Sequence, residues 1–159
     1  MISVVVLDFD GVVLESNDVK TRAFRNVFAR FPEHLDAMMA CHEANVSASR
    51  FTKFDHLIRE RLGRGDDPVL RESLARDFTE RTMEHLRSVP FVPGAEAFLK
   101  EFANRVPLFV ASVTPQEDLD AIIASRGIGW AFRRVYGCPP WTKPGAIRDI
   151  LQAEQCAAA

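Results

Sequence analysis

The chain has 159 residues, of which 47% are hydrophobic, so it can bury a sizeable core and is expected to be globular. Twenty basic residues against 22 acidic ones give a formal net charge of −2. This balance provides no positive field for a nucleic-acid backbone or a membrane surface. It is compatible with a small charged substrate.

The cysteines and the N-terminus indicate the compartment. Cys41, Cys138 and Cys156 are odd in number and lack a C-x-x-C spacing, so they predict neither a disulfide framework nor a zinc site. The first residues lead directly into a predicted strand and two acids, without the basic segment of a signal peptide. We therefore expect a reducing, cytoplasmic location.

The first predicted element is a strand that ends at two carboxylates. Residues 2 to 7 are apolar except Ser3, which is typical of a strand buried on both faces of a parallel sheet. Asp8, Asp10 and Gly11 follow directly. Open α/β sheets bind ligands beyond the carboxyl ends of their strands, so the two acids mark a candidate site.

A helical block follows this strand. Ser16 and Asn17 are cap signals for a helix that ends before Pro32, and no strand pattern interrupts the helices after it. The further helices are expected at about 34–44, 50–62 and 68–87. The pattern predicts an inserted helical cap at residues 16–88, within a core formed by residues 1–15 and 89–159.

The second half of the chain alternates strands and helices, which predicts an α/β core. Strands are expected at 107–112 and 133–137, and helices begin near Pro93 and Pro144. Between the strands, Thr114, Pro115 and Glu117 have the spacing of a capping box with proline in the first helical turn.

Four polar residues stand at or beyond the ends of the three predicted strands: Asp8, Asp10, Ser112 and Lys143. Taken singly, each has an ordinary explanation as a turn residue, a helix cap or a solvated lysine. Together they converge on one edge of the sheet, which favours a site.

The segments that carry these residues resemble known motifs. LDFDGVVLES, VASVTP and WTKPGAIRDIL are similar, in this order, to the first three motifs of the haloacid dehalogenase superfamily, with a helical cap after the first. The resemblance implies a Rossmann-like parallel sheet and Mg²⁺-dependent phosphoryl transfer. An acid two residues after the nucleophile implies a phosphatase or phosphomutase rather than a dehalogenase.

The residue types fit this chemistry. Asp8 suits the nucleophile that forms an aspartyl phosphate, and Asp10 the general acid and base. Ser112 would bind the phosphoryl oxygens, and Lys143 would pair with the phosphate and Asp8. Both acids would hold Mg²⁺. Ser112 is preferred to Thr114, because the latter is expected to cap a helix.

Substrate choice is expected to depend on the cap. Arg50 and Lys53 lie three residues apart at the start of a predicted cap helix, and Lys20 lies early in the first one. The alternative for both lysines is a solvated basic face. Arg50 is the preferred substrate contact, because the resemblance implies an arginine at this junction and a guanidinium can bind an anion bidentately. Gly11 is a further substrate-binding candidate.

The family's fourth motif, an acidic GDxxxD segment on a further strand, has no match in PGAIRDILQAEQCAAA after Lys143. The core is therefore expected to be incomplete at its C-terminal side, and the strand at residues 2–7 to lack a neighbour. A fragment of a longer protein is the preferred explanation, and pairing with another chain or an adapted fold are the alternatives. Self-association through this unpaired edge is expected.

The sequence thus predicts a Mg²⁺-dependent phosphatase of a small phosphorylated metabolite, with no nucleic-acid or membrane partner. A phosphomutase acting on a sugar phosphate and a truncated domain without turnover remain as alternatives.

Overall fold

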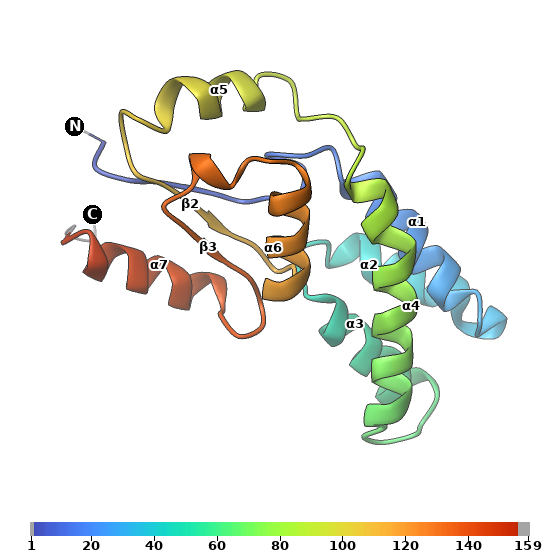
Figure 1. Ribbon diagram of the computed structural model, residues 1–159. Coiled ribbons are helices and arrows are strands. Elements are labelled where there is room, and N and C mark those ends of the chain that lie inside the picture. Colours follow the sequence, from blue (N-terminus) through green and yellow to red (C-terminus); the bar gives the residue numbers. More distant parts are fainter. Residues whose placement is uncertain (1, 156–159) are drawn as a thin grey trace. The chain divides into compact units, whose positions relative to one another are not determined.

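The computed structural model describes residues 2–155, so Met1, Cys156 and the terminal alanines lie outside the described residues. The chain divides into two compact units (Figure 1). Met1–Ser16 and Arg87–Ala159 form an α/β unit, and Asn17–Leu86 form a helical unit. That the helical unit acts as a cap stays a prediction.

The described residues of the α/β unit form a parallel sheet in the order β1-β2-β3. Its strands are β1 (Val5–Leu7), β2 (Leu108–Ala111) and β3 (Arg134–Tyr136). Val6 of β1 lies opposite Phe109, and Val110 of β2 opposite Val135. Because the strands are parallel, their carboxyl ends lie at one edge. The predicted α/β class is confirmed.

Helices cover this sheet (Figure 1). They are α5 (Ala95–Phe102), α6 (Gln116–Ser125) and α7 (Lys143–Ala153), with a 3₁₀ turn at Gly129–Ala131. Ala146 and Ile150 of α7 pack against sheet residues Phe109, Ala111 and Tyr136. Packing of α7 against the sheet thus supports the strands whose carboxyl ends carry the candidate residues.

The burial of β1 differs from the prediction. All four residues of β2 are buried, whereas Val5–Leu7 are each only partly buried. The cause is position: among the described residues β1 pairs with β2 alone, which makes it an edge strand. An apolar hollow of about 350 Å³, lined by Leu7, Val12, Phe98 and their neighbours, adjoins it.

The start of α6 also differs from the prediction. Pro115 is the N-cap and no side chain caps the helix, so the expected capping box does not form. The loop after β3 binds this segment instead. The Gly137 N–H donates to Gln116 Oε1 over 2.7 Å, and the Cys138 N–H donates to the Thr114 carbonyl over 2.9 Å.

The four predicted helical segments of the helical unit are confirmed. The described elements are α1 (Asn17–Phe28), a 3₁₀ turn (Pro32–His34), α2 (Leu35–Ala44), α3 (Arg50–His56) with a π-helical continuation (Leu57–Arg61), and α4 (Pro68–Leu86). Their core is aromatic: Phe24 lies 4.5 Å from Phe78 between ring centroids, and Phe28 and Phe54 pack beside them. Such aromatic pairs add specific geometry to apolar burial.

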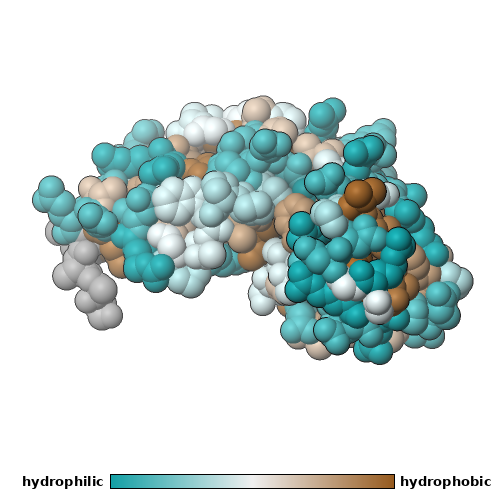
Figure 2. Space-filling model, turned by 90° about the horizontal axis from the view of Figure 1, so that it is seen from below, coloured by the Kyte–Doolittle hydropathy of each residue, from teal (hydrophilic) through white to brown (hydrophobic). Residues whose placement is uncertain are grey.

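The surface of the chain is mainly hydrophilic on the face shown in Figure 2, with small hydrophobic areas between. Large exposed apolar side chains such as Val46, Val69 and Trp130 lie on separate segments: the loop after α2, helix α4 and the 3₁₀ turn at Gly129–Ala131. Among the described residues, no helix combines the length and the apolar character needed to cross a membrane.

Gly137 offers a test of how the loop after β3 holds the segment after β2. A Cβ at this position would lie 2.5 Å from the Gln116 nitrogen and 2.8 Å from the Thr114 carbonyl oxygen. Gly137→Ala is therefore expected to lower the free energy of unfolding by about 1–3 kcal/mol in urea denaturation. Gly129→Ala is the matched control, because its Cβ would meet only Ile123 Cγ2 at 3.7 Å. Equal effects of both would contradict the close packing.

Self-association stays a prediction, which concerns the edge position of β1 among the described residues. An unpaired edge leaves N–H and C=O groups available to another strand, and apolar side chains beside it add to the driving force. Sedimentation velocity should show a dimer at high protein concentration and its dissociation to a monomer at low concentration. A monomer at every concentration would show that the edge needs no second copy.

Candidate functional site

The first predicted site residue, Asp8, pairs with a lysine from the far end of the chain. It follows β1, and its Oδ2 lies 2.5 Å from Lys143 Nζ, while its Oδ1 accepts the Phe9 N–H over 2.8 Å. The two side chains of the pair remain 39% and 33% exposed, so a ligand can reach them. Lys143 begins α7, which Thr142 caps by accepting the Gly145 N–H. The helix start therefore fixes the lysine beside the acid.

Asp10 is bound by hydroxyl groups. Ser16 Oγ donates to its Oδ1 over 2.6 Å, and Thr114 Oγ1 donates to its Oδ2 over 2.9 Å. Ser112 Oγ lies 3.5 Å from the same Oδ2. Such donors fix the orientation of the carboxylate. The carboxylate thus links the loop after β1 to the segment after β2.

Ser112 and Thr114 both take part in the contacts around Asp10, and the role of Ser112 toward a phosphoryl group stays a prediction. Ser112 is 2% exposed, and its Oγ accepts the Thr114 N–H over 3.1 Å while facing Asp10. The sequence predicts Thr114 as a helix cap, but its hydroxyl donates a hydrogen bond to Asp10 and does not cap α6. Sequence reasoning missed Thr114 as a site residue, and its place two residues after Ser112 was the available signal.

The predicted site residues separate into two groups. Asp8, Asp10, Ser112 and Lys143 come together at the carboxyl ends of β1 and β2. Gly11 is in the same loop, where a φ of 70° and an N–H bond to the Leu14 carbonyl form its turn. The predicted cap residues Lys20, Arg50 and Lys53 belong to the helical unit.

Arg50 is packed inside the helical unit. Its NH1 donates to Thr79 Oγ1 of α4 over 2.9 Å, and its guanidinium lies over the rings of Phe51 and Phe78, at 5.2 and 5.6 Å from their centroids. These contacts hold the guanidinium in a defined place. Its role as a substrate contact stays a prediction.

The side chain of Lys53 is only 3% exposed. The alternative prediction, that Lys53 belongs to a solvated basic face, is therefore wrong. Lys53 Nζ lies 2.9 Å from His42 Nδ1 of α2 and 4.7 Å from the centroid of the Phe24 ring. Burial lowers the pKa of Lys53 to about 8, with Cys41 opposing the shift and Lys20 adding to it. Burial, and then Lys53, lower the pKa of His42 to about 4.

The donor set at the strand ends bears on metal binding. The Asp8 carboxylate is half-exposed, and the Asp10 backbone carbonyl is a second oxygen in the same loop. Among the described residues, no group of three or more His, Cys, Asp or Glu side chains forms a metal cage. Oxygen ligands with several retained waters suit Mg²⁺, so these residues fit a weakly held ion of that type.

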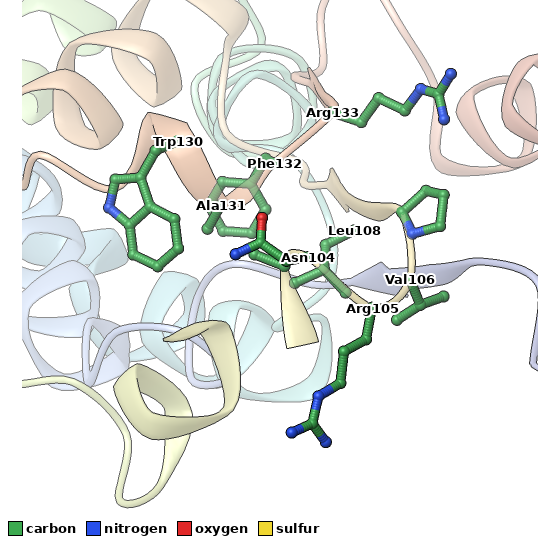
Figure 3. Close-up of a pocket in the computed structure, with 10 residues that line it drawn as sticks. Asn104, Arg105, Val106, Leu108, Trp130, Ala131, Phe132 and Arg133 are labelled. Atoms are coloured by element: carbon green, nitrogen blue, oxygen red, sulfur yellow. The ribbon is translucent and has the colours of Figure 1, made fainter. Parts of the chain in front are cut away.

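A pocket of about 380 Å³ lies at the opposite end of the strands, where β2 and β3 begin. In Figure 3 the side chains of Arg105 and Arg133 extend away from one another. Each is paired with a glutamate, Arg105 with Glu101 and Arg133 with Glu154. The pocket therefore offers no cluster of cations for an anionic ligand, and the carboxyl ends remain the candidate site.

Comparisons with known proteins agree with this geometry at the level of the fold. No family model matches the chain, and neither does any curated protein sequence. Among solved structures, a haloacid dehalogenase-like hydrolase from Bacteroides fragilis has a TM-score of 0.73 at 14% identity, covering 99% of this chain and 75% of that protein. The chain has the fold of the haloacid dehalogenase-like hydrolases.

Two further structures of the haloacid dehalogenase-like fold are similar to the chain. CbbY from Rhodobacter sphaeroides, in complex with phosphate, has a TM-score of 0.69 at 21% identity, covering 98% of this chain and 73% of that one. A protein from Thermotoga maritima described as a beta-phosphoglucomutase has a TM-score of 0.64 at 17% identity, with 98% and 72% coverage. The resemblance found in the sequence is thus confirmed for the fold.

The Thr114 hydroxyl offers a test of the contacts around Asp10. Thr114→Val keeps the shape but removes the donor to Asp10 Oδ2. We expect it to lower the free energy of unfolding at neutral pH by about 1–3 kcal/mol, the usual value of a hydrogen bond to a charged group. Thr114→Ser should recover most of the loss. Full stability of the valine variant in urea denaturation would show that the hydroxyl does not hold this carboxylate.

Proposed function

We propose that this protein is a Mg²⁺-dependent phosphomonoesterase that acts on a small phosphorylated metabolite through an aspartyl phosphate on Asp8. The observation that carries the proposal is the Asp8–Lys143 pair, with Asp10 held beside it by hydroxyl donors. The similarity to CbbY, whose structure contains phosphate, supports the same assignment. Phosphoryl transfer needs mainly positioning and charge stabilisation, which these residues supply.

In the first half of the reaction, a carboxylate oxygen of Asp8 attacks the phosphorus and the ester bond to the leaving group breaks. Protonated Asp10 gives its proton to the departing oxygen, so that an alcohol leaves. The Lys143 ammonium stabilises negative charge on the phosphoryl oxygens. The Ser112 hydroxyl, which faces the same edge, orients the group being transferred.

In the second half, Asp10 takes a proton from a water molecule that attacks the phosphorus. The bond between phosphorus and Asp8 breaks, which releases inorganic phosphate and restores both carboxyl groups. The hydroxyl donors Ser16 and Thr114 hold Asp10 in place for both steps. One residue therefore serves as acid and then as base.

The proposed metal site uses Asp8 and the backbone carbonyl of Asp10. When bound there, Mg²⁺ would offset negative charge on the phosphoryl group. Few protein ligands imply that the ion keeps most of its waters and binds weakly.

A phosphomutase is the second candidate, supported by the similarity to the Thermotoga maritima protein. In this case the phosphoryl group on Asp8 passes to a second hydroxyl of a sugar phosphate rather than to water. An assay of phosphate release over a panel of phosphate esters with Mg²⁺ distinguishes the two. Interconversion of sugar phosphates without phosphate release would favour the mutase. The absence of both activities would favour a domain without turnover.

The nucleophile can be tested directly. Asp8→Asn keeps the shape but removes the attacking charge, so kcat/KM for phosphate release should fall by about three orders of magnitude or more. Asp36→Asn, at an exposed position in α2, is the control and should keep full activity. Undiminished activity in the Asp8 variant would remove the aspartyl phosphate from the mechanism.

A further inference from the structure

Helix α7 carries a carboxylate, Asp149, that is bound by two side chains of the neighbouring strand β3. Tyr136 Oη donates to its Oδ2 over 2.7 Å, and Arg134 Nη1 donates to the same oxygen over 2.9 Å. Tyr136 and Arg134 are two residues apart on the strand, so both side chains point to the face that α7 covers. Hydrogen bonds to an ionised acceptor are stronger than those between neutral groups. We call these three residues the β3–α7 clamp.

The tyrosine of the clamp is fixed by the packing around it. Tyr136 is 1% exposed, and its ring meets the Trp141 ring edge to face, with 5.0 Å between the centroids. The Arg134 guanidinium lies over both rings, at 4.7 and 5.3 Å from their centroids. Burial, and then the hydrogen bond with Asp149, raise the pKa of Tyr136 to about 12, so the phenol keeps its proton near pH 7. The clamp therefore presents a fixed donor to the helix.

Asp149 and the candidate site residue Lys143 belong to the same helix. They are six residues apart, which corresponds to about 9 Å along the helix axis. Ala146 and Ile150 of this helix are buried against the sheet, but apolar contacts are non-directional and restrain rotation of a helix less than hydrogen bonds do. Rotation of α7 about its axis would move Lys143 Nζ from its place 2.5 Å from Asp8 Oδ2.

We propose that the β3–α7 clamp positions Lys143, through the orientation of α7, for its contacts with Asp8 and with the phosphoryl group. This inference rests on the proposed function, which gives Lys143 its role toward the phosphoryl group. Asp149, Tyr136 and Arg134 are then positioning residues that act through the helix. Because Lys143 stabilises charge that is transferred in the reaction, its displacement should lower kcat more than it raises KM.

The kinetic test weakens the clamp while keeping its packing. Tyr136→Phe keeps the ring but loses the bond to Asp149, and Asp149→Asn removes the charge that strengthens both bonds. With para-nitrophenyl phosphate and Mg²⁺, kcat should be about tenfold lower in both variants, because a small misplacement can cost up to about a hundredfold in rate. Glu154→Gln is the matched control. It removes an ion pair with Arg133 at the other end of α7 and should keep the parent kcat.

A second measurement follows Lys143 directly and needs no turnover. The ¹³Cε–¹Hε resonances of Lys143, assigned by their loss in Lys143→Met, report the surroundings of the ammonium group beside Asp8. Asp8→Asn removes the partner charge and supplies the reference position of these resonances. In folded Tyr136→Phe and Asp149→Asn proteins the resonances should move toward that reference. In Glu154→Gln they should stay at the parent position.

The two measurements separate this inference from the proposed function. A Lys143 resonance that moves in the clamp variants, without phosphate release by the parent protein, would support the positioning role and contradict the phosphatase. Phosphate release with the parent kcat and an unmoved Lys143 resonance in both clamp variants would overturn the positioning role. A lower free energy of unfolding in urea, with kcat and resonance unchanged, would likewise overturn it, since the clamp would then only stabilise the fold.

Discussion

The hydrogen bonding of one carboxylate, that of Asp10, joins the segments on which the rest of the site depends. A partly buried carboxylate needs donors, because an unsatisfied one loses hydration without compensation. Here the donors come from Ser16, before the helical unit begins, and from Thr114, after β2. Asp10 and Ser112 are 102 residues apart in the chain, and yet they face one another. The sheet aligns the strand ends, and these bonds fix the loops beyond them.

The neighbouring acid has a different environment, although it is only two residues away. Asp8 faces the positive charge of Lys143, whereas Asp10 faces neutral hydroxyls. A nearby cation and a set of neutral donors stabilise a carboxylate by different means and to different extents. Two carboxyl groups with unlike surroundings can take unlike roles in one reaction, as nucleophile and as proton carrier. Under the proposed mechanism, this difference in surroundings would suit Asp8 to act as the nucleophile and Asp10 as the proton carrier.

Patterns that depend on local chemistry were readable from the sequence. The apolar runs and the cap signals at Ser16 and Asn17 predicted elements that the structure contains. Features that depend on distant partners were not. The local sequence predicts that Thr114 caps a helix, but its hydroxyl donates to Asp10 instead. The burial of Lys53 depends on the packing of three helices. Competition between local and tertiary partners decides such cases.

The position of β1 has a consequence for the order in which the protein folds during synthesis. Val5–Leu7 leave the ribosome before their partner strand, Leu108–Ala111, which follows only after the helical unit has been made. The helical unit has its own aromatic core and short connections, so it can fold before β2 has been synthesised and paired with β1. During that interval the apolar segment and its unpaired backbone are exposed to the cell. Chaperone binding to the nascent chain would be most valuable between the emergence of α1 and the emergence of β2.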